Sequence, residues 1–407
     1  MMKAIYCFLI IAVFLSVSSA AQSGQPTPQR PRVVVVDKMP QPVVTSTPTP
    51  VRTPPPTDEF REVKTGQTMS FREIKSRIAE ARRELQSRPL STASSEPNEV
   101  APVEFVRIAY HDWRNGKIDF VVMSKEQFLS TAGEKELVSE SGRRIRSRTI
   151  RGNGVNTPIV LTDENGNNHL PLMVQYPVIR KGKYIEMAYY MSTHRGLVTP
   201  EVVNAGRFYV QNIIELAREK LRQKGIVIQP KIADIAERLA TVEHVDHYRF
   251  RTEESKAIFD DIYTLFALNE GQTYRYSVSS AGAGGMVQMI PSTYRMVRSW
   301  HPNVPLMPDF VEGMQNHVNA AQAMLLYMQR TWNDLVASET IRDAIANDVA
   351  TAEQLMASGY NSNPARLAGY IKRGGTGWTG LIPRETKIYL SIYDAIERDV
   401  PMTPRAK

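Results

Sequence analysis

The chain has 407 residues and a formal net charge of +8 at pH 7. This length allows two domains that each bury a hydrophobic core. The only cysteine, Cys7, lies in an N-terminal apolar run, so an intramolecular disulfide is excluded and no thiol chemistry is expected after that run. The positive charge favours an anionic polymer or surface as a partner, although ordinary solubility accounts for it equally well.

The first 21 residues have the pattern of a secretory signal peptide. Lys3 precedes an apolar run from residue 4 to residue 17, and small residues then lead to Ala20 and Ala21, after either of which we expect cleavage. The run is too short for a comfortable membrane span, and no later segment has 18 consecutive apolar residues. We therefore expect an exported protein, periplasmic, in the cell wall or extracellular, without a stable membrane anchor or a nucleic-acid partner.

Two polar stretches precede the first extended apolar pattern. Residues 22–57 contain ten prolines, which predicts a Pro-rich disordered linker. Within residues 58–102 we predict one helix and a polar linker. Ser70 and Glu73 have the spacing of a capping box at the start of this helix, and we expect the helix to end before Pro89.

Residues 103–198 are predicted to form a small β-rich domain whose role the sequence leaves open. Apolar runs flank three turn dipeptides and so favour three hairpins, at Asn115-Gly116, Asn165-Gly166 and Lys181-Gly182. Five arginines lie between Arg143 and Arg151. They could dock an acidic surface or belong to a solvated hairpin arm.

From residue 199 to residue 400 the pattern changes to amphipathic helices. Thr199 and Pro200 are expected to start a helix whose buried stripe includes Leu216, and Thr252 is the expected N-cap of another helix. Two apolar stripes follow, each predicting one long helix, at residues 310–332 and 341–355. A sheet region followed by a helical region predicts an α+β fold.

One stretch, from residue 265 to residue 291, combines several features of a catalytic site. An apolar helical pattern ends at Glu270, and Ser279 follows nine residues later. A Gly-rich turn that includes Gly285 then leads to Gln288 and Pro291. A carboxyl group beside a buried face at the C-terminal end of a helix has a raised pKa, which a general acid needs at neutral pH.

This stretch resembles the active-site segment of the soluble lytic transglycosylase family, which belongs to the lysozyme-like superfamily. Two further segments resemble the family's later motifs, namely Gly359-Tyr360-Asn361 and Pro383-Arg384-Glu385-Thr386-x-x-Tyr389. The resemblance covers about residues 250–395 and implies a mainly helical, lysozyme-like domain at residues 199–400.

The resemblance also implies a reaction. Glu270 would protonate the oxygen of the β-1,4 bond between N-acetylmuramic acid and N-acetylglucosamine in peptidoglycan glycan strands. As a carboxylate it would then deprotonate the muramoyl C6 hydroxyl, which closes on C1 and leaves a 1,6-anhydro end. The substrate-binding residues implied are Ser279, Gly285, Gln288, Tyr360, Asn361, Glu385 and Tyr389.

In this scheme Gly285 would let the backbone approach a sugar, Gln288 and Ser279 would bind sugar substituents, and Tyr360 would support Glu270 rather than fill the core. No cofactor is implied. His244 and His247 could form a metal pair, but no third ligand has a suitable spacing, so we expect no metal site.

Two alternatives remain open. The same fold could hydrolyse the glycan with water, as goose-type lysozymes do. Alternatively, departures from the family pattern, such as Gly271 in place of the usual serine, could mark a glycan-binding wall protein with little turnover.

Overall fold

The computed structural model describes residues 69–88, 90, 104–180, 183–269 and 282–406. The expected signal peptide, the Pro-rich linker, Glu270 and Ser279 lie outside these residues. Among the described residues, no helix is both long and apolar enough to cross a membrane.

The N-terminal half is built on a seven-stranded antiparallel sheet with the order β2-β1-β6-β5-β4-β3, in which β7 also pairs with β6. The strands are β1 (Phe105–Asp112), β2 (Lys117–Ser124), β3 (Glu134–Val138), β4 (Arg144–Thr149), β5 (Ile159–Asp163), β6 (Asn168–Arg180) and β7 (Lys183–Met191). The sheet curls because β6 pairs with β1, β5 and β7 along its length. As a result the chain after β3 reaches β2, where the backbone N–H of Glu140 donates to the Phe120 carbonyl at 2.9 Å.

The turn dipeptides predicted the sheet in part. The β1–β2 and β5–β6 hairpins surround Asn115-Gly116 and Asn165-Gly166 as expected, and β6 and β7 flank residues 181–182. The β3–β4 hairpin accounts for the arginine-rich segment. Arg144, Arg146 and Arg148 alternate with more deeply buried residues along β4, and two of them lie opposite acidic residues of β3.

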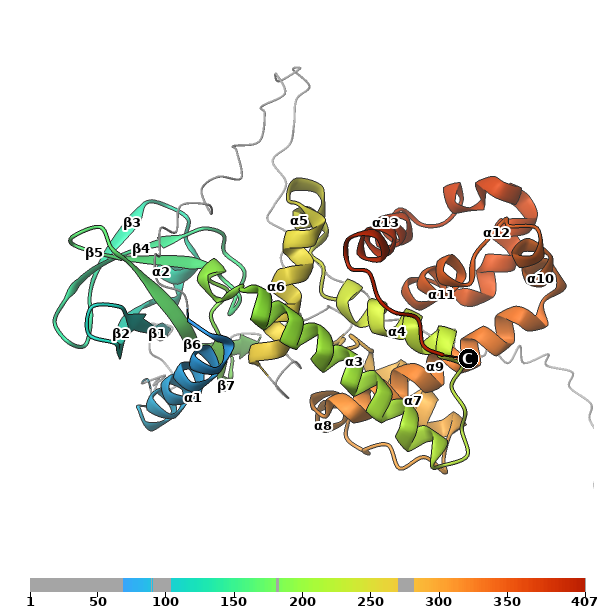
Figure 1. Cartoon of the computed structure of the whole chain (residues 1–407), viewed down its shortest axis with the longest axis horizontal. Coiled ribbons are helices and arrows are strands. Elements are labelled where there is room, and N and C mark those ends of the chain that lie inside the picture. The colour runs from blue at the N-terminus through green and yellow to red at the C-terminus, as the bar shows by residue number, and fades with distance from the viewer. Residues whose placement is uncertain (1–68, 89, 91–103, 181–182, 270–281, 407) are drawn as a thin grey trace, which may run out of the picture.

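Helix α1 (Phe71–Ser87) packs against the sheet, beside β1, β6 and β7, and so belongs to the same structural unit (Figure 1). Ser70 and Glu73 form the expected capping box, and the apolar stripe that includes Ile74 and Leu85 is buried. A short helix, α2 (Lys125–Leu129), follows β2.

The C-terminal half is helical, which together with the sheet gives the expected α+β class. Its α-helices are α3 (Pro200–Arg222), α4 (Pro230–Val242), α5 (His247–Thr252), α6 (Ser255–Leu268), α7 (Pro291–Trp300), α8 (Phe310–Gln315), α9 (His317–Ala337), α10 (Glu339–Ala346), α11 (Ala352–Asn361), α12 (Leu367–Gly374) and α13 (Arg384–Asp399). Short 3-10 turns are η2 (Arg195–Leu197), η4 (Pro364–Arg366) and η5 (Gly375–Gly380). Figure 1 shows α3 running from the sheet toward the helices at the other end of an elongated molecule.

Several expected helix boundaries were wrong. Thr252 ends α5 instead of capping the next helix, because α6 starts at Ser255. The stripe from 310 to 332 is divided between α8 and α9, since the Asn316 side chain accepts the Asn319 N–H and caps α9. The stripe from 341 to 355 breaks at Asp348, whose φ of 54° cannot continue a helix.

The expected buried stripe of α3 was wrong at one residue. Leu216 is 46% exposed, and Ile214 and Ala217 are buried instead.

Helices α3 and α6 pack closely against each other. The crossing point is Gly206, where an added Cβ would lie 1.9 Å from the Tyr263 carbonyl oxygen. Only a residue without a side chain allows this approach. The crossing therefore fixes the direction of α6, whose C-terminal end leads to the segment containing Glu270.

Candidate active site

The Gly-rich turn of the central stretch folds as a compact buried loop between α6 and α7. The Gly284 N–H donates to the Met289 carbonyl at 3.1 Å, which closes the loop. Gly285 has a φ of +71°, and an added Cβ would meet the Met314 carbonyl oxygen at 2.5 Å. Glycine is therefore required here because the loop packs against α8. The expectation that this glycine makes room for a sugar is not supported, since the backbone that crowds it belongs to the protein.

Gln288 stabilises the same loop from inside. Its side chain is 1% exposed, and its Nε2 donates to the Gly285 carbonyl at 2.9 Å. Its φ of 47° places it in the left-handed region, which is uncommon for a residue other than glycine. In this structure the Gln288 amide therefore binds the loop, although the sequence predicted a contact with the substrate.

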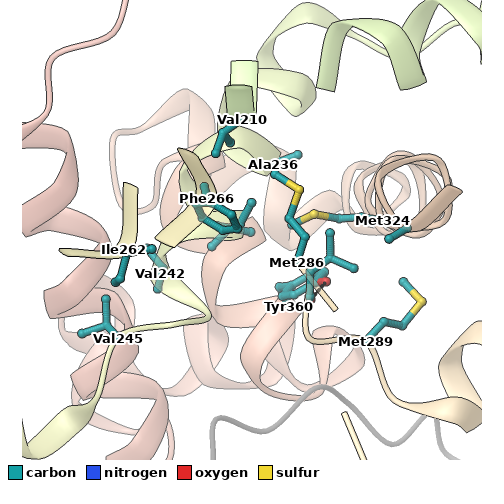
Figure 2. Packing of buried hydrophobic residues seen from close by; sticks show 14 of the residues in the cluster. Val210, Ala236, Val242, Val245, Ile262, Phe266, Met286, Met289, Met324 and Tyr360 are labelled. Carbon is teal, nitrogen blue, oxygen red and sulfur yellow. Dashed lines mark hydrogen bonds between the residues drawn. The ribbon is translucent and has the colours of Figure 1, made fainter. Parts of the chain in front are cut away.

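Tyr360, at the end of α11, connects the second motif to this loop. Its hydroxyl donates to the Val287 carbonyl at 2.8 Å, and its side chain is 1% exposed. Figure 2 shows Tyr360 in the same buried cluster as Met286 and Met289. Tyr360 is thus a core residue with a satisfied hydroxyl, which differs from the expected presentation of that hydroxyl to the catalytic carboxyl group.

The third motif contacts the second through α13. The Thr386 hydroxyl donates to Asn361 Oδ1 at 2.9 Å, and both side chains are buried. Glu385, the residue before Thr386, is half-buried. The three motifs, separated by about 70 and 25 residues in the chain, are thus joined by two hydrogen bonds.

Tyr389 contacts a buried acidic residue, Glu243, that the sequence did not indicate. Its hydroxyl donates to Glu243 Oε1 at 2.5 Å, and neither side chain is exposed. Burial raises the pKa of the Glu243 carboxyl group well above its usual range, although the hydrogen bond from Tyr389 acts in the opposite direction. Glu243 caps the C-terminal end of α4, four residues after the buried Leu239, and this spacing could have indicated its burial.

The residue before Glu270, Asn269, is fixed by a hydrogen bond to strand β7. Asn269 ends α6 and is fully buried, and its Oδ1 accepts a hydrogen bond from the backbone N–H of Met191 at 3.1 Å. The sheet therefore fixes the residue before Glu270. Glu270 and Ser279 themselves lie outside the described residues.

Within the described ranges, no group of three or more His, Cys, Asp or Glu side chains has a geometry that could hold a metal ion. His244 Nε2 lies 3.0 Å from the Met286 carbonyl, and burial lowers the pKa of its imidazole to about 4. At neutral pH the ring is therefore uncharged and donates to this carbonyl. His244 thus links α4 to the Gly-rich loop.

In comparisons with family models, curated proteins and solved structures, the chain matches none of them.

Proposed function

We propose that this protein is a peptidoglycan lytic transglycosylase with a lysozyme-like domain. It cleaves the β-1,4 bond between N-acetylmuramic acid and N-acetylglucosamine and forms 1,6-anhydromuramoyl ends. It acts outside the cytoplasm, in the periplasm or cell wall, because the N-terminal 21 residues have the pattern of a signal peptide.

The observation that supports this proposal best is the assembly of the three motifs. Their order and spacing suggested one site, and the hydrogen bonds Tyr360–Val287 and Thr386–Asn361 join them. A chance likeness of three short segments would not require them to be in contact. The buried Asn269, bonded to Met191, adds a rigid start for the segment that holds Glu270.

In the proposed reaction Glu270 is the only protein group that transfers protons. Its carboxylic acid gives a proton to the glycosidic oxygen as the bond to C1 breaks. The resulting carboxylate takes the proton of the muramoyl C6 hydroxyl, whose oxygen bonds to C1 and forms the anhydro ring. The acid is regenerated in the same turnover. The reaction therefore requires no second catalytic carboxylate and consumes no water, unlike the usual two-carboxylate scheme.

The other residues divide into two groups. Ser279, Asn361 and Glu385 are assigned to substrate binding. Gly285, Gln288, Tyr360 and Tyr389 are assigned to building the loop and its surroundings, because each is buried against protein or hydrogen-bonded to it.

The test is product analysis with purified sacculi. The chain from residue 22 onward is incubated with sacculi, and the masses of the soluble muropeptides are measured by mass spectrometry. We expect products one water lighter than those of a lysozyme. Glu270→Gln should lower turnover by roughly 10²- to 10⁴-fold, the usual contribution of a general acid or base, whereas Glu385→Gln should lower it only in part.

Two results would contradict the proposal. Hydrated, reducible muramic ends would indicate a goose-type-lysozyme-like hydrolase. Binding of the wild-type chain to sacculi without release of any fragment would indicate a glycan-binding wall protein.

A further inference from the structure

A cavity of about 440 Å³ lies where the sheet unit meets the helices. The loop after β4 forms one wall, with Arg151 and Asn156, and the segment from Met191 to Val198 forms a second. Helices α5 and α6 and the residues before α5 form the rest. Its size falls within the range of small-ligand sites, about 300–1,000 Å³.

The cavity has a fixed charged framework. Arg249 donates to both oxygens of Glu253, at 2.9 and 2.6 Å, and to Asp261 at 2.6 Å. Arg195 pairs with the other oxygen of Asp261 at 3.2 Å. Burial would raise the pKa of Glu253, but the hydrogen bonds and charge of Arg249 outweigh it and keep the pKa below its usual range. Glu253 is therefore charged at neutral pH.

Two side chains of the sheet unit have donors that this framework does not use fully. Arg151 forms a long ion pair with Glu253, at 3.5 Å, and its buried Nε has no hydrogen-bond partner among the described residues. His194 is 4% exposed, and its Nδ1 accepts the Gly196 N–H at 3.0 Å. The pKa of this imidazole is lowered to about 4 by burial, so the ring is neutral and its proton lies on Nε2, which has no partner within the described part of the chain.

The opposite wall offers an acceptor. Asp246 caps α5, and its Oδ1 accepts the backbone N–H groups of Tyr248 and Arg249 at 2.8 and 3.0 Å. Its carboxylate lines the cavity and is half-buried. The cavity thus offers donors for a carboxylate on one side and an acceptor for an ammonium group on another.

The cavity is also linked to Asn269, the last described residue before the proposed catalytic residue. Met191 lines it and, through its N–H, holds Asn269, the residue before Glu270. If Glu270 cleaves the glycan, the part of the substrate that can reach this cavity is a short branch of the glycan. In peptidoglycan that branch is the stem peptide, which has carboxylates and, at its diamino acid, an ammonium group.

We propose that this cavity binds the stem peptide of peptidoglycan, with Arg151 and His194 holding a carboxylate and Asp246 holding an ammonium group. This inference rests on the proposed function. It gives the sheet unit a role, because two of these three residues come from it.

The test measures binding without cleavage. The probe is synthetic L-Ala-γ-D-Glu-meso-diaminopimelate, titrated calorimetrically into the chain from residue 22 onward. Arg151→Met should raise the dissociation constant by about tenfold or more, as expected for the loss of a hydrogen bond to a charged group. Asp246→Asn should weaken binding similarly while preserving the helix cap, because asparagine caps as well as aspartate.

The matched control is Arg144→Met, which removes an exposed arginine of the same unit that does not line the cavity. It should bind the probe as the wild type does. Circular dichroism and thermal unfolding of each variant establish that it is folded. A probe with its carboxylates amidated should bind about as weakly to the wild type as the unmodified probe does to Arg151→Met.

The outcomes separate this inference from the proposed function. Cleavage of sacculi without measurable tripeptide binding, or equal binding by Arg151→Met and Arg144→Met, would overturn the peptide site and leave the transglycosylase. Tripeptide binding that depends on Arg151, without cleavage of sacculi, would retain the peptide site and overturn the enzyme.

Discussion

Glu243 is a carboxyl group without contact to solvent, between α4 and α13. Tyr389 donates to one of its oxygens, and the other has no hydrogen-bond partner among the described residues. An isolated buried carboxylate is far more costly than a buried neutral acid. Its raised pKa therefore means that Glu243 is protonated in the folded protein at pH values where the unfolded chain has already ionised.

This difference predicts a specific pH dependence of stability for Glu243→Gln. The folded pKa exceeds the unfolded value of about 4.5, so the stability that the protonated group supplies is complete below pH 4.5 and is lost as the pH rises toward the folded pKa. Glutamine keeps the shape and the acceptor for Tyr389 but does not ionise. Its advantage over the wild type in the free energy of unfolding should grow by up to about 1.4 kcal/mol per pH unit through this window.

Denaturant unfolding of both proteins from pH 4 to pH 8 measures this difference. A difference that stays constant with pH would show that Glu243 ionises normally in the folded protein.

The second prediction at this scale compares two glycines of the Gly-rich loop. Gly282 and Gly285 both have positive φ, but among the described residues the nearest atom to an added Cβ at Gly282 is Pro291 Cγ, at 3.9 Å. Gly282→Ala should therefore cost only the backbone strain, about 1–2 kcal/mol. Gly285→Ala adds a collision with the Met314 backbone and should cost roughly 1–3 kcal/mol more. Chemical denaturation compares the two, and equal losses would mean that α8 does not restrain the loop.

The crossing of α3 and α6 allows a test at the level of whole elements. Alanine is favoured over glycine in a helix interior by about 1 kcal/mol, so propensity alone predicts that Gly206→Ala stabilises the protein. The Cβ would overlap the Tyr263 carbonyl oxygen of α6, and overpacking of this kind costs more than propensity gives. We expect a net loss of roughly 2 kcal/mol or more.

Asn204→Ala, on the exposed side of the same helix, is the control and should be neutral or slightly stabilising. Thermal unfolding of both variants makes the comparison. A stabilised Gly206→Ala would mean that the two helices can separate without cost.

Local signals predicted where many elements begin. The capping box at Ser70 and the N-cap at Thr199 with Pro200 start α1 and α3 as expected. Periodicity alone did not predict the interruptions. Asn316 and Asp348 break stripes whose apolar residues remain in register, because two helices packed on one core can share a continuous pattern. The turn signals did not predict the β3–β4 hairpin, because its turn, at Ser141-Gly142, lacks an Asn-Gly pair; only the arginine-rich segment indicated a hairpin arm there, as one of two alternatives.

For the candidate site, the sequence predicted the motifs but not what each residue contacts. The motifs indicated that Gly285, Gln288 and Tyr360 belong to the candidate site. A motif does not reveal whether a side chain contacts substrate or the rest of the protein. Their contacts with Met314, Gly285 and Val287 depend on segments distant in the chain or on loop geometry. Glu243 was missed because its partner, Tyr389, lies 146 residues away.

At the scale of the molecule, the sheet and the helices share their cores. One buried cluster combines residues of α1 and the sheet with Val202 of α3 and with Ala267 and Leu268 at the end of α6. The larger cluster likewise joins sheet residues such as Val106 to the helical half. Because the end of α6 is packed against the sheet unit, a change in that unit would alter the position from which the Glu270 segment starts.

The C-terminal residues after α13 return to the helical half and close it. Arg405 pairs with Glu215, with Asp234 at 2.8 Å and with Glu237 at 2.6 Å, and its side chain is 9% exposed. The Pro401 carbonyl accepts a hydrogen bond from Arg207 at 2.9 Å. Asp234 and Glu237 belong to α4 and are mostly buried, so Arg405 compensates charges that α4 alone leaves inside the protein.

Arg405→Met should therefore destabilise the protein at neutral pH. Removing one partner of a buried ion pair costs about 3–5 kcal/mol, but water can reach the two carboxylates if the tail lifts, so we expect a loss nearer 2 kcal/mol. Burial raises the pKa of Glu237, against the charge of Arg405, and the substitution raises it further. The deficit is thus complete at neutral pH and becomes smaller as the pH falls through the folded pKa of Glu237, because Glu237 is then protonated in both proteins and its part of the deficit is lost. Arg398→Met, which breaks an ion pair with Asp399 from an exposed arginine, is the control and should show no measurable change. Urea unfolding at pH 7 and pH 4 measures the difference in the free energy of unfolding between the variant and the wild type. A deficit of the same size at both pH values would mean that Arg405 stabilises α4 through packing and not through charge.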